Sequence, residues 1–172
     1  MVSFLDDGLE AGATFNLAKI VSLQVHADLL QCGILPNENK CVWNPCQIIT
    51  WLGVVINTIN STISATAKTI HSLESDIENL MLFHVKRIAT IAGKIISFGN
   101  CIGNVTRLMS RNLYVLINSS RSWKDNVYLN ERAINNLKFW KNNVSKLNGI
   151  PLWPSKGKPS RIVYSDASDV AC

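Results

Sequence analysis

The chain has 172 residues, 47% of them hydrophobic, and a net charge of +5, which suits one domain or two small ones with a real core and argues against disorder. Its apolar runs are short, and Asp6 and Asp7 precede any hydrophobic segment, so the sequence predicts neither a transmembrane helix nor a signal peptide. Five irregularly spaced cysteines indicate reduced thiols, and hence an intracellular protein of the cytoplasm or nucleus.

The first part of the chain is predicted to be mixed. Residues 2–5 are typical of a short strand, and Asp7-Gly8 is typical of a tight turn. Apolar residues at three- and four-residue spacing predict a helix from Ala13 to Cys32, which Gly33 ends. The β-branched and aromatic run at 47–56 predicts two short strands with a bend at Gly53, and a turn and a further short strand follow.

The chain then becomes helical and basic. Helices are predicted over Lys68–Phe83, Val85–Phe98 and Val105–Asn118, and from a cap at Asn130 to Gly149. In the third of them, Leu108 and Leu113 are expected to face inward. The Pro/Gly-rich stretch after Asn148 predicts a linker, and "SRIVYSDASD" a final strand.

Charge divides the same two parts. Residues 1–83 carry three Lys against eight Asp and Glu, a balance of −5, whereas residues 84–146 carry eleven Lys and Arg against two acids, a balance of +9. An acidic segment before a basic one suggests a cation site beside a surface that binds a polyanion. Charge by itself indicates the solvated faces of ordinary helices equally well.

Several motifs in this order resemble the reverse transcriptases. "FLDDG" is similar to the family's aromatic-x-Asp-Asp hairpin, with Phe4 in place of the usual Tyr, and "WLG" at 51–53 is similar to its primer grip. "IVYSDAS" resembles the first strand of an RNase H domain. The stretch "IGNVTRLMSRNLYVLINSSRSW" and the "YSDAS" ending most resemble the polymerase of DIRS-type retrotransposons, which are transposable elements with a tyrosine recombinase.

The resemblance implies an α+β chain in four segments. Residues 1–65 would form the end of the palm, with its β-hairpins and helix; residues 66–148 the helical thumb and connection; residues 149–159 a linker; and residues 160–172 the truncated start of an RNase H-like domain.

It also implies a two-metal nucleotidyl transfer, which is RNA-directed DNA synthesis. Asp6 and Asp7 would be catalytic residues and ligands of Mg²⁺ or Mn²⁺ in the polymerase, because carboxylates suit hard cations, and Asp166 would have this role in RNase H. Trp51, Leu52 and Gly53 would form the primer grip. The partners would be an RNA template, an RNA–DNA or DNA duplex, and dNTP. Without the other motifs, "DDG" is simply a good turn, and Trp51 is equally consistent with a plain core residue.

Nucleic-acid contacts are expected from Lys86, Arg87, Arg107, Arg111 and Tyr114. Arg107 and Arg111 are one turn apart on the third predicted helix, and Tyr114 is three residues further, so all three would share a face. Arg for phosphate and Tyr for sugar or base would suit a thumb that follows an RNA–DNA duplex.

The family requires a further palm Asp and the fingers, and RNase H requires further carboxylates after Asp166. The chain is therefore expected to be a fragment of a polyprotein, without polymerase activity by itself and without stably bound metal. Two alternatives remain open. One is a non-catalytic, basic helical module that binds nucleic acid, for which residues 84–146 would suffice. The other is a helical interaction protein in which the motifs arose by chance.

Overall fold

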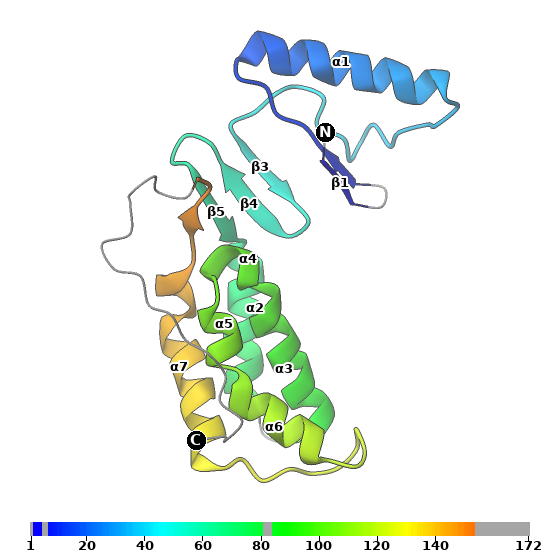
Figure 1. The fold of residues 1–172 in the computed structure, drawn as a ribbon. Helices are drawn as coiled ribbons and strands as arrows, with labels where there is room; N and C mark the ends of the chain where they lie inside the picture. Colours follow the sequence, from blue (N-terminus) through cyan, green and yellow to red (C-terminus); the bar gives the residue numbers. More distant parts are fainter. Residues whose placement is uncertain (1, 5–6, 81–83, 154–172) are drawn as a thin grey trace, which may run out of the picture.

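The structure is a computed structural model that describes residues 2–4, 7–80 and 84–153, and its class is α+β, as predicted (Figure 1). The strands are β1 (Val2–Phe4), β2 (Asp7–Leu9), β3 (Ile48–Trp51), β4 (Val54–Asn57), β5 (Thr62–Ala65) and β6 (Ile150–Pro151). The helices are α1 (Phe15–Gln31), α2 (Ala67–Glu78), α3 (Val85–Ser97), α4 (Gly99–Ile102), α5 (Val105–Leu108), α6 (Arg111–Ser119) and α7 (Glu131–Leu147). In Figure 1 the sheet of β3–β6 lies between α1 with the first hairpin and a helical unit built from α2–α7.

The first hairpin pairs β1 with β2 in antiparallel register. Phe4 lies opposite Asp7, and Ser3 lies opposite Gly8. The prediction that Asp7-Gly8 forms the turn is wrong, because the chain has already reversed direction before Asp7. Residues 5 and 6, which connect the strands, lie outside the described residues.

Helix α1 forms where the sequence predicts it. Thr14 caps its start, since the Thr14 hydroxyl oxygen accepts a hydrogen bond from the Leu17 N–H at 3.2 Å. Gly33 follows its end with φ of 77°, a backbone conformation that favours glycine. No residue of α1 is buried, and Ile20, Leu23 and Leu30 are exposed.

Polar contacts connect α1 to the loop that follows it. The Glu38 carboxylate bonds the His26 ring at 2.9 Å and accepts from the Trp43 indole N–H at 2.8 Å. These hydrogen bonds, from His26 first and Trp43 second, lower the pKa of Glu38 below its ordinary 4.5. The Ser22 hydroxyl also donates to the Trp43 carbonyl at 2.7 Å.

The second sheet has the antiparallel order β3-β4-β5-β6. The bend predicted at Gly53 is confirmed as a two-residue turn in which Leu52 and Gly53 have φ of 47° and 80°. Two successive positive φ values are typical of the turn that matches the twist of a β-hairpin. The strand predicted after this hairpin is also confirmed, as β5.

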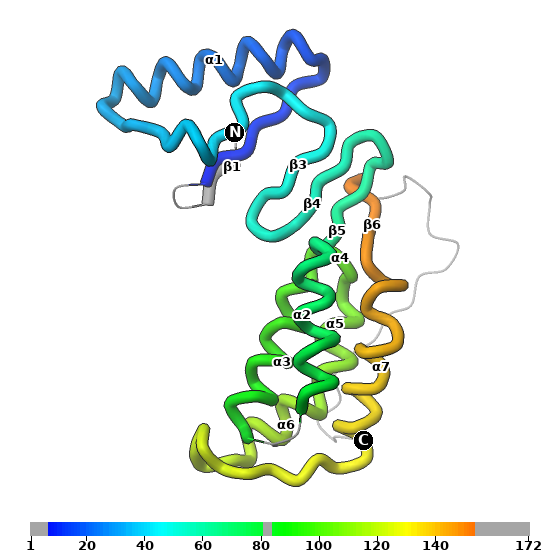
Figure 2. The backbone as a smooth tube through the Cα atoms, turned by 180° about the vertical axis from the view of Figure 1, so that it is seen from behind, coloured from blue at the N-terminus to red at the C-terminus, as the bar shows by residue number. Residues whose placement is uncertain are grey.

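The sequence did not predict β6, the strand at one edge of this sheet. Within the stretch predicted as a linker, Ile150 and Pro151 pair with β5, so that Ile150 lies opposite Ile63. Figure 2 shows β6 beside β5 after α7 has returned along the helical unit. Asn148 strengthens this junction, because its side-chain amide bonds both the N–H and the C=O of Ala65, at 2.8 and 3.1 Å.

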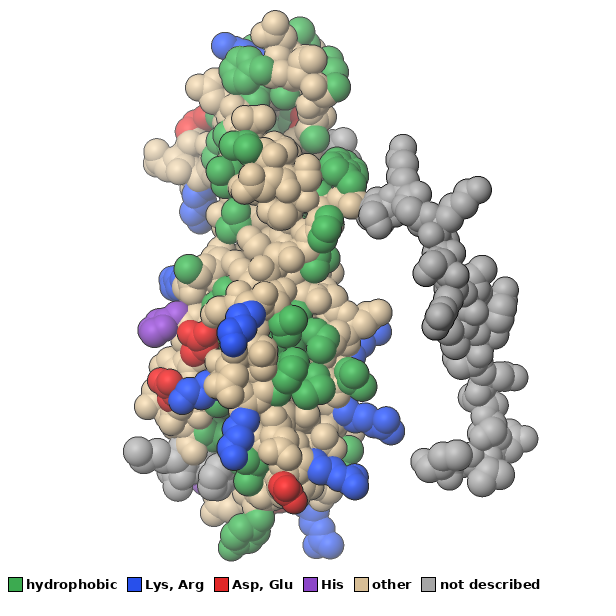
Figure 3. Space-filling model, turned by 90° about the vertical axis from the view of Figure 1, so that its left-hand side faces the viewer, with side chains coloured by type: hydrophobic (Ala, Val, Ile, Leu, Met, Phe, Trp, Pro, Cys, Tyr) green, Lys and Arg blue, Asp and Glu red, His purple; other side chains and the backbone are tan. Residues whose placement is uncertain are grey.

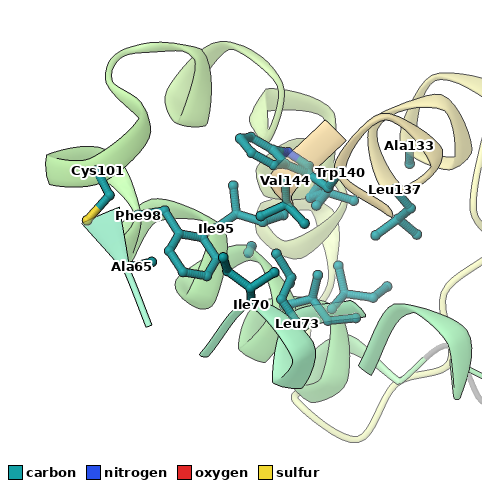
Figure 4. Close-up of a cluster of buried hydrophobic side chains, with 14 of the residues drawn as sticks. Ala65, Ile70, Leu73, Ile95, Phe98, Cys101, Ala133, Leu137, Trp140 and Val144 are labelled. Carbon is teal, nitrogen blue, oxygen red and sulfur yellow. The ribbon is translucent and has the colours of Figure 1, made fainter. Parts of the chain in front are cut away.

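The helical unit contains the main core. Buried apolar side chains of α2, α3, α6 and α7 pack together in it, and Figure 4 shows Leu73, Ile95 and Trp140 among them. Trp140 is fully buried, and its indole N–H donates to the Met109 carbonyl at 3.0 Å. The predicted cap at Asn130 is confirmed, because its side chain accepts from the Ala133 N–H at 2.9 Å.

Two predicted helices differ from those in the structure: one ends earlier than predicted, and the other is divided in two. The helix expected over Lys68–Phe83 ends at Glu78, and Phe83 lies outside the described residues. The helix expected over Val105–Asn118 is interrupted between Leu108 and Arg111, and Leu108 is 68% exposed instead of facing inward. The buried Ser110 lies in this interruption, and its hydroxyl donates to the Thr106 carbonyl at 2.7 Å.

Candidate nucleic-acid interface

Of the three carboxylates predicted to bind metal, only that of Asp7, on the first hairpin, belongs to a described residue. Asp7 is exposed at the start of β2, whereas Asp6 and Asp166 lie outside the described residues. Three residues after Asp7, the Oε2 atom of Glu10 is buried and has no hydrogen-bond partner in the described part of the chain. Over residues 2–4, 7–80 and 84–153, no group of three His, Cys, Asp or Glu side chains gathers in a way that could bind a metal ion.

The predicted primer-grip residues lie in the other sheet. Trp51 is the last residue of β3 and is half-buried. Leu52 and Gly53, both with positive φ, form the turn that follows. The indole nitrogen of Trp51 is buried, and none of the described residues accepts a hydrogen bond from it. The Asp7 hairpin and the Trp51 hairpin are thus two separate β-structures, with no strand pairing between them among the described residues.

The five residues predicted to bind nucleic acid, four of them basic, lie on the helical unit, and all of them are exposed. They are Lys86 and Arg87 on α3, Arg107 on α5, and Arg111 and Tyr114 on α6. Helix α3 packs against both α5 and α6, so these side chains come from neighbouring helices. Figure 3 shows one face of the molecule, on which Lys and Arg side chains are spread over the helical unit.

Two basic side chains of residues 84–146 are engaged by acids of α2. Lys94 Nζ contacts the Asp76 carboxylate at 2.6 Å, and Lys141 Nζ contacts Glu78 at 3.1 Å. Within the described residues, the other nine Lys and Arg of this segment form no ion pair. The positive charge that remains is therefore directed at solvent and suits a polyanion.

The geometry of Arg107, Arg111 and Tyr114 differs in part from the prediction. Because the helix is interrupted at Ser110, the two arginines do not lie one turn apart on a single helix. Arg111 and Tyr114 do belong to one helix, three residues apart, and both are exposed. Arg107 lies in a shallow depression whose other polar side chains include Ser97 and Asn104.

Sequence reasoning missed the loop between α6 and α7. This loop carries Arg121 and Lys124 on either side of Trp123, and the indole of Trp123 is 61% exposed. A tryptophan between two basic residues in a polar segment is the signal that could have identified it, since aromatic and basic side chains together are typical of nucleic-acid surfaces.

Comparisons with known proteins add no family to these observations. Neither protein-family models, nor curated proteins, nor solved structures include a match to this chain. Among the described residues, no helix has the length and apolar character needed to span a membrane.

Proposed function

We propose that the helical unit of this chain binds the backbone of a nucleic-acid duplex, as the thumb of a retrotransposon reverse transcriptase. The observation that carries the proposal is the basic surface of this unit, on which nine Lys and Arg side chains have no acidic partner among the described residues. Phosphate contacts supply affinity without reading base sequence, so the binding is expected to be weakly selective and sensitive to salt.

The order of the motifs supports the reverse transcriptase part of the proposal. A hairpin with Asp7, a helix, the Trp51 hairpin and a helical unit follow one another along the chain. In this proposal Asp6 and Asp7 would bind Mg²⁺ or Mn²⁺, and Asp166 would belong to RNase H. Asp6 and Asp166 lie outside the described residues, so the support that the structure offers is for binding of nucleic acid by the basic surface.

The proposal is tested by changing two exposed arginines together. The variant Arg107→Ala/Arg111→Ala should keep its fold, because neither side chain belongs to the core. It should bind duplexes more weakly, and the slope of log K against log salt should fall by about 1.4–1.8, which corresponds to two phosphate contacts. Fluorescence anisotropy over a salt series measures both quantities, with circular dichroism as the test of folding.

A matched control removes the same charge elsewhere. Lys19 and Lys40 are exposed in the acidic part of the chain, so Lys19→Ala/Lys40→Ala lowers the net charge equally and should leave the salt slope unchanged. An RNA–DNA hybrid should bind at least as well as a DNA duplex. An equal decrease of the slope in both double variants would show that net charge, and not a surface that includes Arg107 and Arg111, determines binding.

A helical interaction protein is the second candidate, and one observation favours it. Helix α1 exposes Ile20, Leu23 and Leu30, and exposed apolar side chains of this kind are typical of a surface that a protein partner covers. Absence of nucleic-acid binding at low salt would leave this candidate as the better one.

A further inference from the structure

The exposed Trp123 lies against the start of α3. Its indole, together with Lys86, Ala89 and Thr90, lines an open depression. With 61% of its surface exposed, this is a large aromatic side chain that the core does not use. The loop that carries it joins α6 to α7 and is the yellow-green segment at the lower end of the helical unit in Figure 1.

Backbone hydrogen bonds fix this loop to α3. The Lys86 N–H donates to the Trp123 carbonyl at 3.3 Å, and the Val85 N–H donates to the Asp125 carbonyl at 3.1 Å. His84 and Asn126 form an isolated β-bridge next to these bonds. Trp123 is therefore presented on an anchored backbone, which reduces the entropy that a ligand must remove when it binds.

The surroundings of Trp123 are positively charged. Lys86 lines the depression, while Arg121 and Lys124 flank the indole in sequence, and all three are exposed. The nearest acid in sequence, Asp125, turns its carboxylate to the backbone: its Oδ2 accepts from the N–H groups of Arg121 at 3.1 Å and Ser122 at 2.9 Å. This acid thus serves to shape the loop.

We propose that Trp123 is a stacking platform for an unpaired nucleobase, with the adjoining phosphates bound by Lys86, Arg121 and Lys124. An aromatic ring stacks on every kind of base, and cationic side chains beside it suit the backbone of a single strand. The inference rests on the proposed function, because it assumes that nucleic acid is the polyanion that the basic surface binds.

Unpaired nucleotides are the ligand class that this geometry favours. Inside a duplex, both faces of a base are covered by its neighbours, so an indole cannot stack on it without opening the helix. A single strand or an overhang offers the face of a base without that cost. Trp123 should therefore distinguish single strands from blunt duplexes, whereas Arg107 and Arg111 should contact either one through phosphates.

The experiment compares Trp123→Ala and Trp123→Phe with the unchanged chain. The probe is a fluorescein-labelled oligodeoxythymidylate of about twelve nucleotides, a length within the usual range of single-strand sites. Anisotropy should show a loss of affinity of about 5- to 150-fold for the alanine variant and a smaller loss for the phenylalanine variant. Binding to a blunt DNA duplex should change by less than about twofold.

A spectroscopic measurement reports stacking directly. The chain has five tryptophans, and a base stacked on Trp123 should quench part of their fluorescence. That quenching should disappear in Trp123→Phe. Phe15→Ala is the matched control, because Phe15 is an aromatic residue of similar exposure, 59%, in the acidic part of the chain, and its loss should change neither readout.

The outcomes separate the two proposals. If folded Trp123→Ala binds the oligonucleotide as well as the unchanged chain does, while duplex binding persists, the stacking platform is refuted and the proposed function stands. If Trp123→Ala loses oligonucleotide and duplex binding equally, the preference for unpaired bases is refuted. If the unchanged chain binds neither probe at low salt, the proposed function fails and the platform fails with it.

Discussion

Replacement of Asn148 by alanine should loosen the junction between the sheet and the helical unit. The Asn148 side chain accepts from the Ala65 N–H at 2.8 Å and donates to the Ala65 carbonyl at 3.1 Å, across 83 residues of sequence. It occupies the place at which a neighbouring strand would pair with Ala65, just before β6 begins. Ala65 itself is 5% exposed and belongs to the main core, so water can replace these bonds only in part.

The expected loss follows from the two hydrogen bonds. Each contributes about 0.5–1.5 kcal/mol net, so Asn148→Ala should lower the free energy of unfolding by about 1–3 kcal/mol. The buried Ala65 groups that lose their partner place the result toward the upper end of that range. Urea denaturation followed by circular dichroism measures the change, and the midpoint should fall while the m-value stays constant.

The matched control is Asn142→Ala on the solvent side of α7. Asn142 is exposed, and alanine is the better helix former, so stability should rise by up to about 0.7 kcal/mol. A loss below about 0.5 kcal/mol in Asn148→Ala, with an unchanged m-value, would refute the argument that Asn148 substitutes for a strand at this position.

Three further predictions concern single residues. An added Cβ meets no atom within 4 Å at either Gly53 or Gly93, so the two substitutions differ only in backbone conformation. Gly53→Ala should lower the free energy of unfolding by about 1–2 kcal/mol because φ is 80°, whereas Gly93→Ala on α3 should raise it by about 0.5–1 kcal/mol. Equal effects of the two variants in urea denaturation would contradict this reasoning. Because the folded pKa of Glu38 is lowered, its contacts should persist above pH 4.5 and be lost as the pH falls through the lowered pKa. An NMR titration of the Trp43 indole N–H, which donates to Glu38, would follow this loss, and the same titration in Glu38→Gln should be flat in that range. Burial raises the pKa of the Cys101 thiol, so alkylation at pH 8 should modify the exposed Cys32 first, and equal rates would show that the core opens readily.

Local signals predicted the elements whose causes are local. The cap at Asn130 follows from its own side chain and the helix it precedes, and the bend at Gly53 follows from a backbone conformation that glycine favours. The start of α1 is equally local, because Thr14 bonds the Leu17 N–H three residues away. In each case the residues that determine the structure are within a few positions of one another.

The predictions that failed depend on distant or competing contacts. Strand β6 exists because Ile150 meets Ile63, which no pattern within residues 148–159 indicates. The helix break lies at the buried Ser110, and the spacing of the apolar residues around it does not indicate an interruption. The turn at Asp7-Gly8 is displaced because the pairing of β1 with β2 sets the register, and the turn composition does not.

For the candidate site, Lys86, Arg87, Arg107 and Arg111 are exposed, and their contact with nucleic acid stays a prediction. The sequence reasoning did not name Trp123, because the proposed role of that side chain depends on the hydrogen bonds that fix its loop to α3. Sequence patterns thus indicated the charged part of the proposed interface, while its aromatic part required the tertiary arrangement.

Part of the acidic character of residues 1–83 has a structural use within the helical unit. A substantial share of it lies on α2, where Asp76 and Glu78 pair with Lys94 and Lys141, and Glu74 accepts from the Ser145 hydroxyl at 2.8 Å. Since α2 packs between α3 and α7, these acids join the helices of one unit to each other. They neutralise Lys94 and Lys141, whereas the other nine Lys and Arg side chains of residues 84–146 have no acidic partner among the described residues. Those nine carry the positive charge that is proposed to face phosphate.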